Sequence, residues 1–179
     1  MAQSATVHTF TIDLADMDRG VYERLELRVA RHPSEAADFL VARILAYCLE
    51  YTDGIAFSQG IAAGDEPAVW VKDATGRVTA WIEVGLPDAE RLHRGSKLAE
   101  RAAVYTHRDV TQLLAQLAGK KIYRAEAIPV YALERRVVAE LAGLIERRTA
   151  LALSVTERQL YAEIAGRSLA TTLTEHRIT

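Results

Sequence analysis

The sequence is poor in the features that identify several classes of protein. A single cysteine, Cys48, excludes an intramolecular disulfide and a cysteine-rich zinc site. Lys and Arg together number 22 and Asp and Glu 24, which gives a formal net charge of −2. The whole chain therefore has no strong attraction for nucleic acid, although this net charge is compatible with a local basic patch. No apolar run is long enough to span a bilayer, and residues 1–10 lack a charged and an apolar signal-peptide segment. We therefore expect a cytoplasmic protein that does not act in a membrane.

The patterns that are present predict one α/β domain over residues 1–179. Half of the residues are hydrophobic, which is ordinary for a folded domain of this length. Strand patterns cover residues 7–14, 22–31, 55–58, 69–73, 78–84, 103–106, 128–133, 150–155, 159–164 and 168–173. Helical patterns begin at Ser34 and Asp88 and cover residues 110–117 and 134–147, and Cys48 falls in the apolar stripe of the first. We predict a mixed sheet flanked by helices, together with a second, antiparallel sheet.

The stretch 65–101 contains the one group of residues that suggests chemistry. It predicts a strand, a tight turn at residues 73–76, a second strand and a helix. If Asp73 and Arg77 flank the turn, Glu83 lies opposite Pro67 and therefore beside Asp65 and Glu66. Carboxylate oxygens are the ligands that Mg²⁺ prefers, and a site of this kind needs only one or two of them. We therefore consider Asp65, Glu66 and Glu83 as metal ligands; the alternative is that Glu83 forms an ion pair with a nearby Arg.

Basic and aromatic residues near this group have two interpretations each. Arg94, Lys97 and Arg101 have the i, i+3, i+7 spacing of one helix face, which is either a phosphate-binding surface or a solvated face. Trp70 and Trp81 lie on the two strands and are either exposed for a partner or, as is commoner for strand aromatics, part of the core.

Several segments resemble the YaeQ family. They are Gly64-Asp65-Glu66-Pro67, the run W-I-E-V-G-L-P-D from Trp81 to Asp88, and the segments at residues 30–35, 57–60 and 104–106. The resemblance covers nearly the whole chain and implies a variant of the PD-(D/E)XK nuclease fold in a family without an established function. It also implies that Ala68 and Gly85 stand where the nuclease motif has its metal-binding Asp and its catalytic Lys.

Two functional hypotheses follow. The first is a Mg²⁺-dependent nucleic-acid phosphodiesterase in which Glu83 holds the metal and Arg94 or Lys97 contacts the phosphate. The second is a non-catalytic module on a nuclease-like fold, which binds a protein or a nucleic acid through the tryptophans and the basic face. Because the Asp and the Lys are missing, we expect nuclease activity to be weak or absent. Gly85→Lys combined with Ala68→Asp should be the most favourable route to gaining it.

Overall fold

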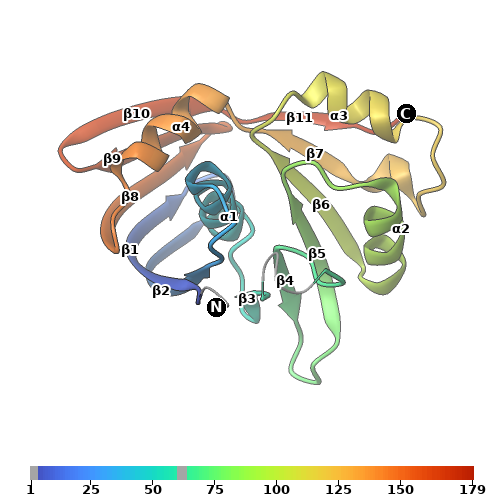
Figure 1. The fold of residues 1–179 in the computed structure, drawn as a ribbon, viewed down its shortest axis with the longest axis horizontal. Helices are drawn as coiled ribbons and strands as arrows, with labels where there is room; N and C mark the ends of the chain where they lie inside the picture. Colours follow the sequence, from blue (N-terminus) through green and yellow to red (C-terminus); the bar gives the residue numbers. More distant parts are fainter. Residues whose placement is uncertain (1–3, 60–63) are drawn as a thin grey trace.

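The computed structural model of the protein describes residues 4–59 and 64–179, which form two twisted sheets with one helix between them (Figure 1). The first sheet has the strand order β10-β9-β8-β1-β2 and the second the order β11-β7-β6-β5-β4-β3. The strands of the first sheet are β1 (Thr6–Asp16), β2 (Val21–Arg31), β8 (Arg148–Thr156), β9 (Gln159–Ile164) and β10 (Arg167–Thr172). Those of the second are β3 (Ile55–Phe57), β4 (Val69–Lys72), β5 (Val78–Val84), β6 (Arg101–Thr106), β7 (Pro129–Ala132) and β11 (Thr174–Arg177). The helices are α1 (Ala37–Leu49), α2 (Ala89–Leu98), α3 (Val110–Leu117) and α4 (Arg135–Leu144), with the 3₁₀ turn η2 (Ala125–Ala127).

The first sheet buries one face and exposes the other, as its alternating sequence predicts. Phe10, Ile12 and Leu14 of β1 are buried, and β2 pairs with β1 as an antiparallel hairpin. The prediction that this sheet is purely antiparallel is wrong, because β1 pairs with β8 in parallel. Alternation identifies the buried face of a strand but not the direction of its neighbour. In the chain, β1 and β8 are separated by most of the second sheet, so no short turn fixes their relative direction.

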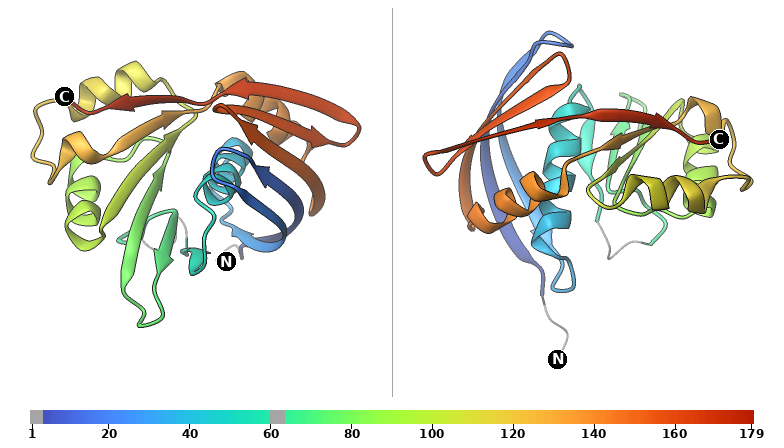
Figure 2. Two further views of the ribbon diagram at one scale, coloured as in Figure 1. Left: turned by 180° about the vertical axis from the view of Figure 1, so that it is seen from behind. Right: turned by 90° about the horizontal axis from the view of Figure 1, so that it is seen from above.

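The second sheet is built around two parallel crossovers. β6 lies parallel to β5 and to β7, with α2 and α3 as the connecting helices. Figure 2 shows α2 and α3 on the outer side of this sheet, where Leu92, Leu113 and Leu117 pack with Val104 and Val130. The predicted order of helix, hairpin, helix and strand is therefore confirmed.

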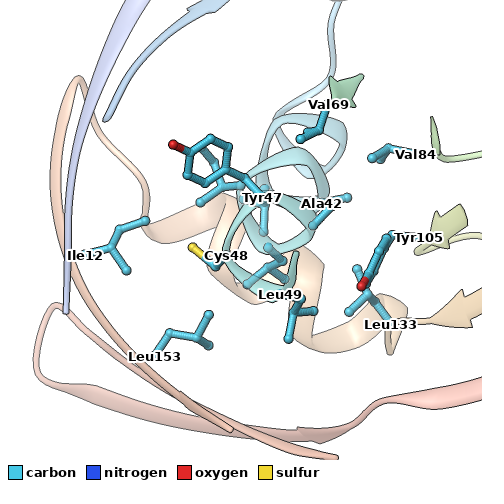
Figure 3. Close-up of a cluster of buried hydrophobic side chains, with 14 of the residues drawn as sticks. Ile12, Ala42, Tyr47, Cys48, Leu49, Val69, Val84, Tyr105, Leu133 and Leu153 are labelled. Atoms are coloured by element: carbon cyan, nitrogen blue, oxygen red, sulfur yellow. The ribbon is translucent and has the colours of Figure 1, made fainter. Parts of the chain in front are cut away.

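The other face of the second sheet packs on α1, which also contacts the first sheet. Figure 3 shows α1 side chains between residues of both sheets, and one buried cluster includes Ile12 of β1, Cys48 of α1 and Val84 of β5. Cys48 has no exposed surface, and burial raises the pKa of its thiol to about 12, so it behaves as a core residue. The expected structural role of Cys48 fits this environment.

Several element boundaries differ from the sequence prediction, and one strand was not predicted. The first helix begins at Ala37 rather than at Ser34, because the Ser34 hydroxyl is bonded to His32 instead of capping the helix. α4 ends at Leu144 rather than at residue 147. The strand β11 was not predicted, because its sequence Thr-Glu-His-Arg has no apolar residue to give an alternating pattern. β10 and β11 form one extended stretch that passes from the first sheet to the second at Leu173 (Figures 1 and 2).

Candidate functional site

The β4–β5 hairpin holds the predicted acidic group, but in a shifted register. Val69 pairs with Ile82 and Lys72 with Val78, and an irregularity falls between Val71 and Lys72. The bulge adds one residue to β5, so Glu83 comes next to Ala68 rather than opposite Pro67 as predicted. The turn itself matches the prediction, since the Asp73 carboxylate accepts the N–H groups of residues 75 and 77.

Glu83 at the end of β5 is buried and already bonded on both carboxylate oxygens. Its exposed fraction is 4%. The Trp81 indole Nε1 donates to Oε1 at 2.9 Å, and Arg91 Nη2 donates to the same oxygen at 3.1 Å. Arg91 Nε lies 3.3 Å from Oε1 and 3.2 Å from Oε2. Burial raises the pKa of Glu83 above its ordinary value, with Arg91 and Trp81 acting in the opposite direction. The carboxylate therefore belongs to a compact ion-paired cluster.

Arg91 connects this cluster to the segment that leads into β4. The Asp88 carboxylate caps α2 by accepting the N–H of Arg91 at 2.8 Å, which fixes the first turn of the helix beside the end of β5. The Arg91 guanidinium also donates to the carbonyl oxygens of Gly64 and Glu66. One side chain thus joins the helix, the sheet and the residues before β4. Of the two alternatives that the sequence left open for Glu83, the ion pair is the one formed, and its partner is Arg91.

In the described part of the chain, Asp65, Glu66 and Glu83 are not grouped as the ligands of one metal ion. Asp65 is exposed, and the Glu66 carboxylate accepts the N–H of Gln59 at 3.1 Å. Within residues 4–59 and 64–179, no three His, Cys, Asp or Glu side chains are grouped as metal ligands. Arg94 and Lys97 are exposed on α2. Among the described residues, the side chains that donate to the Glu83 carboxylate are those of Trp81 and Arg91 and not these two.

The two positions that the resemblance assigns to a missing Asp and Lys are shaped for small residues. Ala68 is 8% exposed. Gly85 has a φ of +88°, and a Cβ atom there would lie 3.1 Å from Cε2 of Phe39. Lysine at position 85 would be strained, so Gly85→Lys is not the favourable route to activity that the sequence indicated.

The tryptophans have different environments. Trp81 is 2% exposed and packs against Gly95 of α2, where an added Cβ would lie 2.4 Å from its Cδ1. The expectation of a core role is therefore confirmed for Trp81. Trp70 is half-buried, with Lys72 Nζ 4.0 Å from its ring centroid.

Arg101 does not share the basic face of α2. The helix ends at Leu98, and Ala99 has the extended backbone of a C-cap, so Arg101 becomes the first residue of β6. Its Nη2 lies 2.7 Å from Glu50 Oε1, and the Tyr105 hydroxyl donates to the same oxygen at 2.8 Å. The prediction that Arg101 lies on one face with Arg94 and Lys97 is wrong, because the predicted helix was one turn too long.

This second polar group lies in a cleft between the two sheets. The cleft has a volume of about 600 Å³, and its polar lining includes Arg19, Glu50, Arg101, Tyr131 and Arg158. Three of its arginines form ion pairs, Arg19 with Asp16, Arg101 with Glu50 and Arg158 with Glu175, and the Asp18 carboxylate accepts the backbone N–H groups of residues 157 and 158. This group was not predicted from the sequence. The available signal was Glu50 at the C-terminal end of a helix, where a carboxylate is unfavourable unless a cation offsets the helix dipole.

Comparison with known proteins identifies the relatives of the chain. The family model described as YaeQ protein matches residues 1–173. The uncharacterized protein YaeQ of Escherichia coli K12 is 29% identical over 176 residues, with 97% of each chain covered. The crystal structure of the YaeQ protein from Pseudomonas syringae superposes with a TM-score of 0.87 at 30% identity, covering 96% of this chain and 95% of the other. That of Xanthomonas axonopodis pv. citri gives 0.83 at 25% identity, covering 98% and 100%. In the described part of the chain, no helix has the length and apolar character needed to cross a membrane.

Proposed function

Starting from the membership of this chain in the YaeQ family, we propose that it is a non-catalytic binding module built on a nuclease-like fold. The observation that carries this proposal is the environment of Glu83. A carboxylate that accepts bonds from Trp81 and a forked Arg91 has few lone pairs left for a metal ion or a water molecule. Its chemistry is that of a structural ion pair.

The surroundings of Glu83 support the same conclusion. Ala68 offers no second ligand, and Gly85 offers no cation to position a water molecule or to stabilise a developing charge. Loss of one such electrostatic contact typically lowers an enzymatic rate by about 10²–10³-fold. Arg94 and Lys97 lie on the exposed side of α2 and do not replace it.

The helix–hairpin–helix–strand order formed by α1, β4, β5, α2 and β6 supports the nuclease-like fold that the sequence resemblance implies. In this proposal the chain has the nuclease-like scaffold, and Glu83 stabilises the sheet through its ion pair with Arg91. The surface of the domain then carries the function.

Calorimetric titration with Mg²⁺ and with Mn²⁺, together with a cleavage assay on labelled single- and double-stranded DNA and RNA, tests the proposal. We expect Glu83→Gln to match the wild-type protein in both assays, with neither metal-dependent cleavage nor a saturable binding heat. Glu163→Gln is the matched control, since it neutralises an exposed carboxylate of the first sheet that is not among the candidate ligands. Metal-dependent cleavage by the wild type that Glu83→Gln abolishes and Glu163→Gln spares would overturn the proposal.

A further inference from the structure

One side of the second sheet carries basic and aromatic side chains from two segments. We call it the α2–η2 surface and define it by Arg94, Lys97, Lys120, Lys121, Tyr123 and Arg124. All six are exposed, and the Tyr123 side chain has an exposed fraction of 42%. The sequence Lys-Lys-Ile-Tyr-Arg at 120–124 is a basic stretch with an aromatic residue, a combination that is typical of nucleic-acid binding.

The two segments are joined into one surface by specific contacts. The backbone N–H of Tyr123 donates to His93 Nδ1 of α2 at 3.1 Å. Ile122 packs in the same apolar cluster as Leu92, so the residues on either side of it point away from the core. Lys97 lies one helical turn after His93 and hence on the same side of α2. Figure 1 shows the segment before η2 next to α2, at the end of the second sheet away from the first.

Among the residues that the structure describes, the cations of this surface have no anionic partners. Within the described residues, none of Arg94, Lys97, Lys120, Lys121 and Arg124 forms an ion pair, whereas Arg77, Arg91, Arg101, Arg136 and Arg158 all do. The acidic residues of the same two segments are Glu90 and Glu126. A chain with a net charge of −2 therefore carries on this surface a group of five cations that have no ion-pair partner among the described residues.

We propose that the α2–η2 surface binds single-stranded nucleic acid; this deepens the binding function proposed above and rests on it. The four cations Arg94, Lys97, Lys120 and Lys121 contact backbone phosphates. Tyr123 offers an exposed ring on which a base stacks, and the Arg124 guanidinium lies 5.3 Å from the centroid of that ring. A single strand has free base faces, whereas the bases of a duplex are already stacked on one another, so the exposed ring favours the single strand.

Fluorescence anisotropy with a labelled 20-nucleotide deoxythymidine strand, measured over a series of NaCl concentrations, tests the charge component. For single strands the slope of log K against log salt is about −0.7 for each phosphate neutralised. Lys120→Glu with Lys121→Glu should therefore reduce the slope by about 1.4. Arg28→Glu with Arg148→Glu is the matched control, because it changes the net charge equally at two exposed, unpaired arginines of the first sheet, and it should leave the slope unchanged.

The stacking component has its own variants. Tyr123→Ala should weaken binding about tenfold at fixed salt, and Tyr123→Phe should bind like the wild type, because a phenyl ring still stacks. Both keep the backbone bond to His93, so the surface is retained. A duplex of the same length should bind more weakly than the single strand.

Three results would overturn the inference. The first is no binding of the single strand at low salt, and the second is an equal loss of salt slope in the Arg28/Arg148 control. The third is competition by polyphosphate together with full affinity of Tyr123→Ala, which would indicate a general polyanion surface. Each of these leaves the non-catalytic assignment intact. Cleavage of the same strand in Mg²⁺ would instead refute that assignment, so the two failures are distinguishable.

Discussion

Arg91→Met should destabilise the protein more strongly than Glu83→Gln. Methionine keeps much of the length of the Arg91 side chain but removes the guanidinium that contacts Glu83 and the carbonyls of Gly64 and Glu66. The Glu83 carboxylate then stays buried with only Trp81 as a donor. Glu83→Gln keeps an oxygen acceptor for the Trp81 indole and leaves Arg91, which is 25% exposed, able to reach water.

The expected magnitude follows from the contact distance and the burial of the pair. At 3.1 Å and an effective dielectric constant near 20, the gross attraction is about 5 kcal/mol. Removing one partner of a fully buried pair typically costs about 3–5 kcal/mol. Because the Arg91 side chain is partly exposed, we expect about 2–3 kcal/mol for Arg91→Met and about 1 kcal/mol for Glu83→Gln.

The loss in Arg91→Met should depend on pH. The folded-state pKa of Glu83 is raised above its ordinary value of 4.5, mainly by burial, and loss of Arg91 raises it further. The folded state therefore holds this proton more tightly than the unfolded state. The stability contribution of this group is full below the unfolded pKa and is lost as pH rises through the folded pKa. The cost of Arg91→Met should be largest at neutral pH and shrink towards pH 4.5.

Urea unfolding of the two single variants and the double variant, at pH 7 and at pH 5, measures these effects as a double-mutant cycle. In the Glu83→Gln background, Arg91→Met should cost only what the bonds to the carbonyls of Gly64 and Glu66 contribute, and it should show no pH dependence from this pair. The coupling between the two sites should be about 2 kcal/mol at pH 7. If Glu83→Gln stabilises the protein instead, the wild-type carboxylate lowers the stability of the fold, as catalytic groups do. The structural role proposed for Glu83 would then be wrong.

Two further predictions concern packing and alkaline stability. Gly95→Ala should lower the free energy of unfolding by about 2 kcal/mol, because its Cβ would collide with Trp81. Gly143→Ala on α4, where a Cβ meets nothing within 4 Å, should instead raise the free energy of unfolding by about 0.5 kcal/mol. A denaturant melt in which Gly95→Ala is neutral would contradict the packing of Gly95 against Trp81. The pKa of Tyr105 is raised well above 10.0, first by burial and next by Glu50. The folded state therefore keeps a proton that the unfolded state releases, and the free energy of unfolding should fall as pH rises above about 10. Tyr105→Phe should show a weaker decline in urea melts between pH 8 and 10.5, and an unchanged decline would assign it to other groups.

The sequence was informative where local chemistry decides the structure. Asp88 caps α2, Gly76 occupies the positive-φ position of the β4–β5 turn, and the alternation of β1 identifies its buried face. Each of these depends on residues within a few positions of one another. The same applies to α2 and α3 as parallel crossovers, because a strand–helix–strand pattern leaves few alternatives.

The rest depends on contacts between distant segments. The bulge in β5 has no sequence signal of its own, yet it moves Glu83 by one position along β4. The parallel pairing of β1 with β8 and the contact of Glu50 with Arg101 each join residues that only the complete fold brings together. For Glu83, residue type indicated either a ligand or an ion pair, and the choice depended on where α2 placed Arg91.

Helix α2 carries two different chemistries, one on residues that contact the sheet and one on exposed residues. Its inner side carries Arg91 and Gly95, which hold Glu83 and Trp81 in the sheet. Its outer side carries Arg94 and Lys97, which have no ion-pair partner among the described residues and face solvent. Because the two sides share no bond, changes at Arg91 should alter unfolding without altering the salt slope of binding, and changes at Lys97 should do the reverse. One helix can therefore stabilise Glu83 through Arg91 and present Arg94 and Lys97 to solvent at the same time.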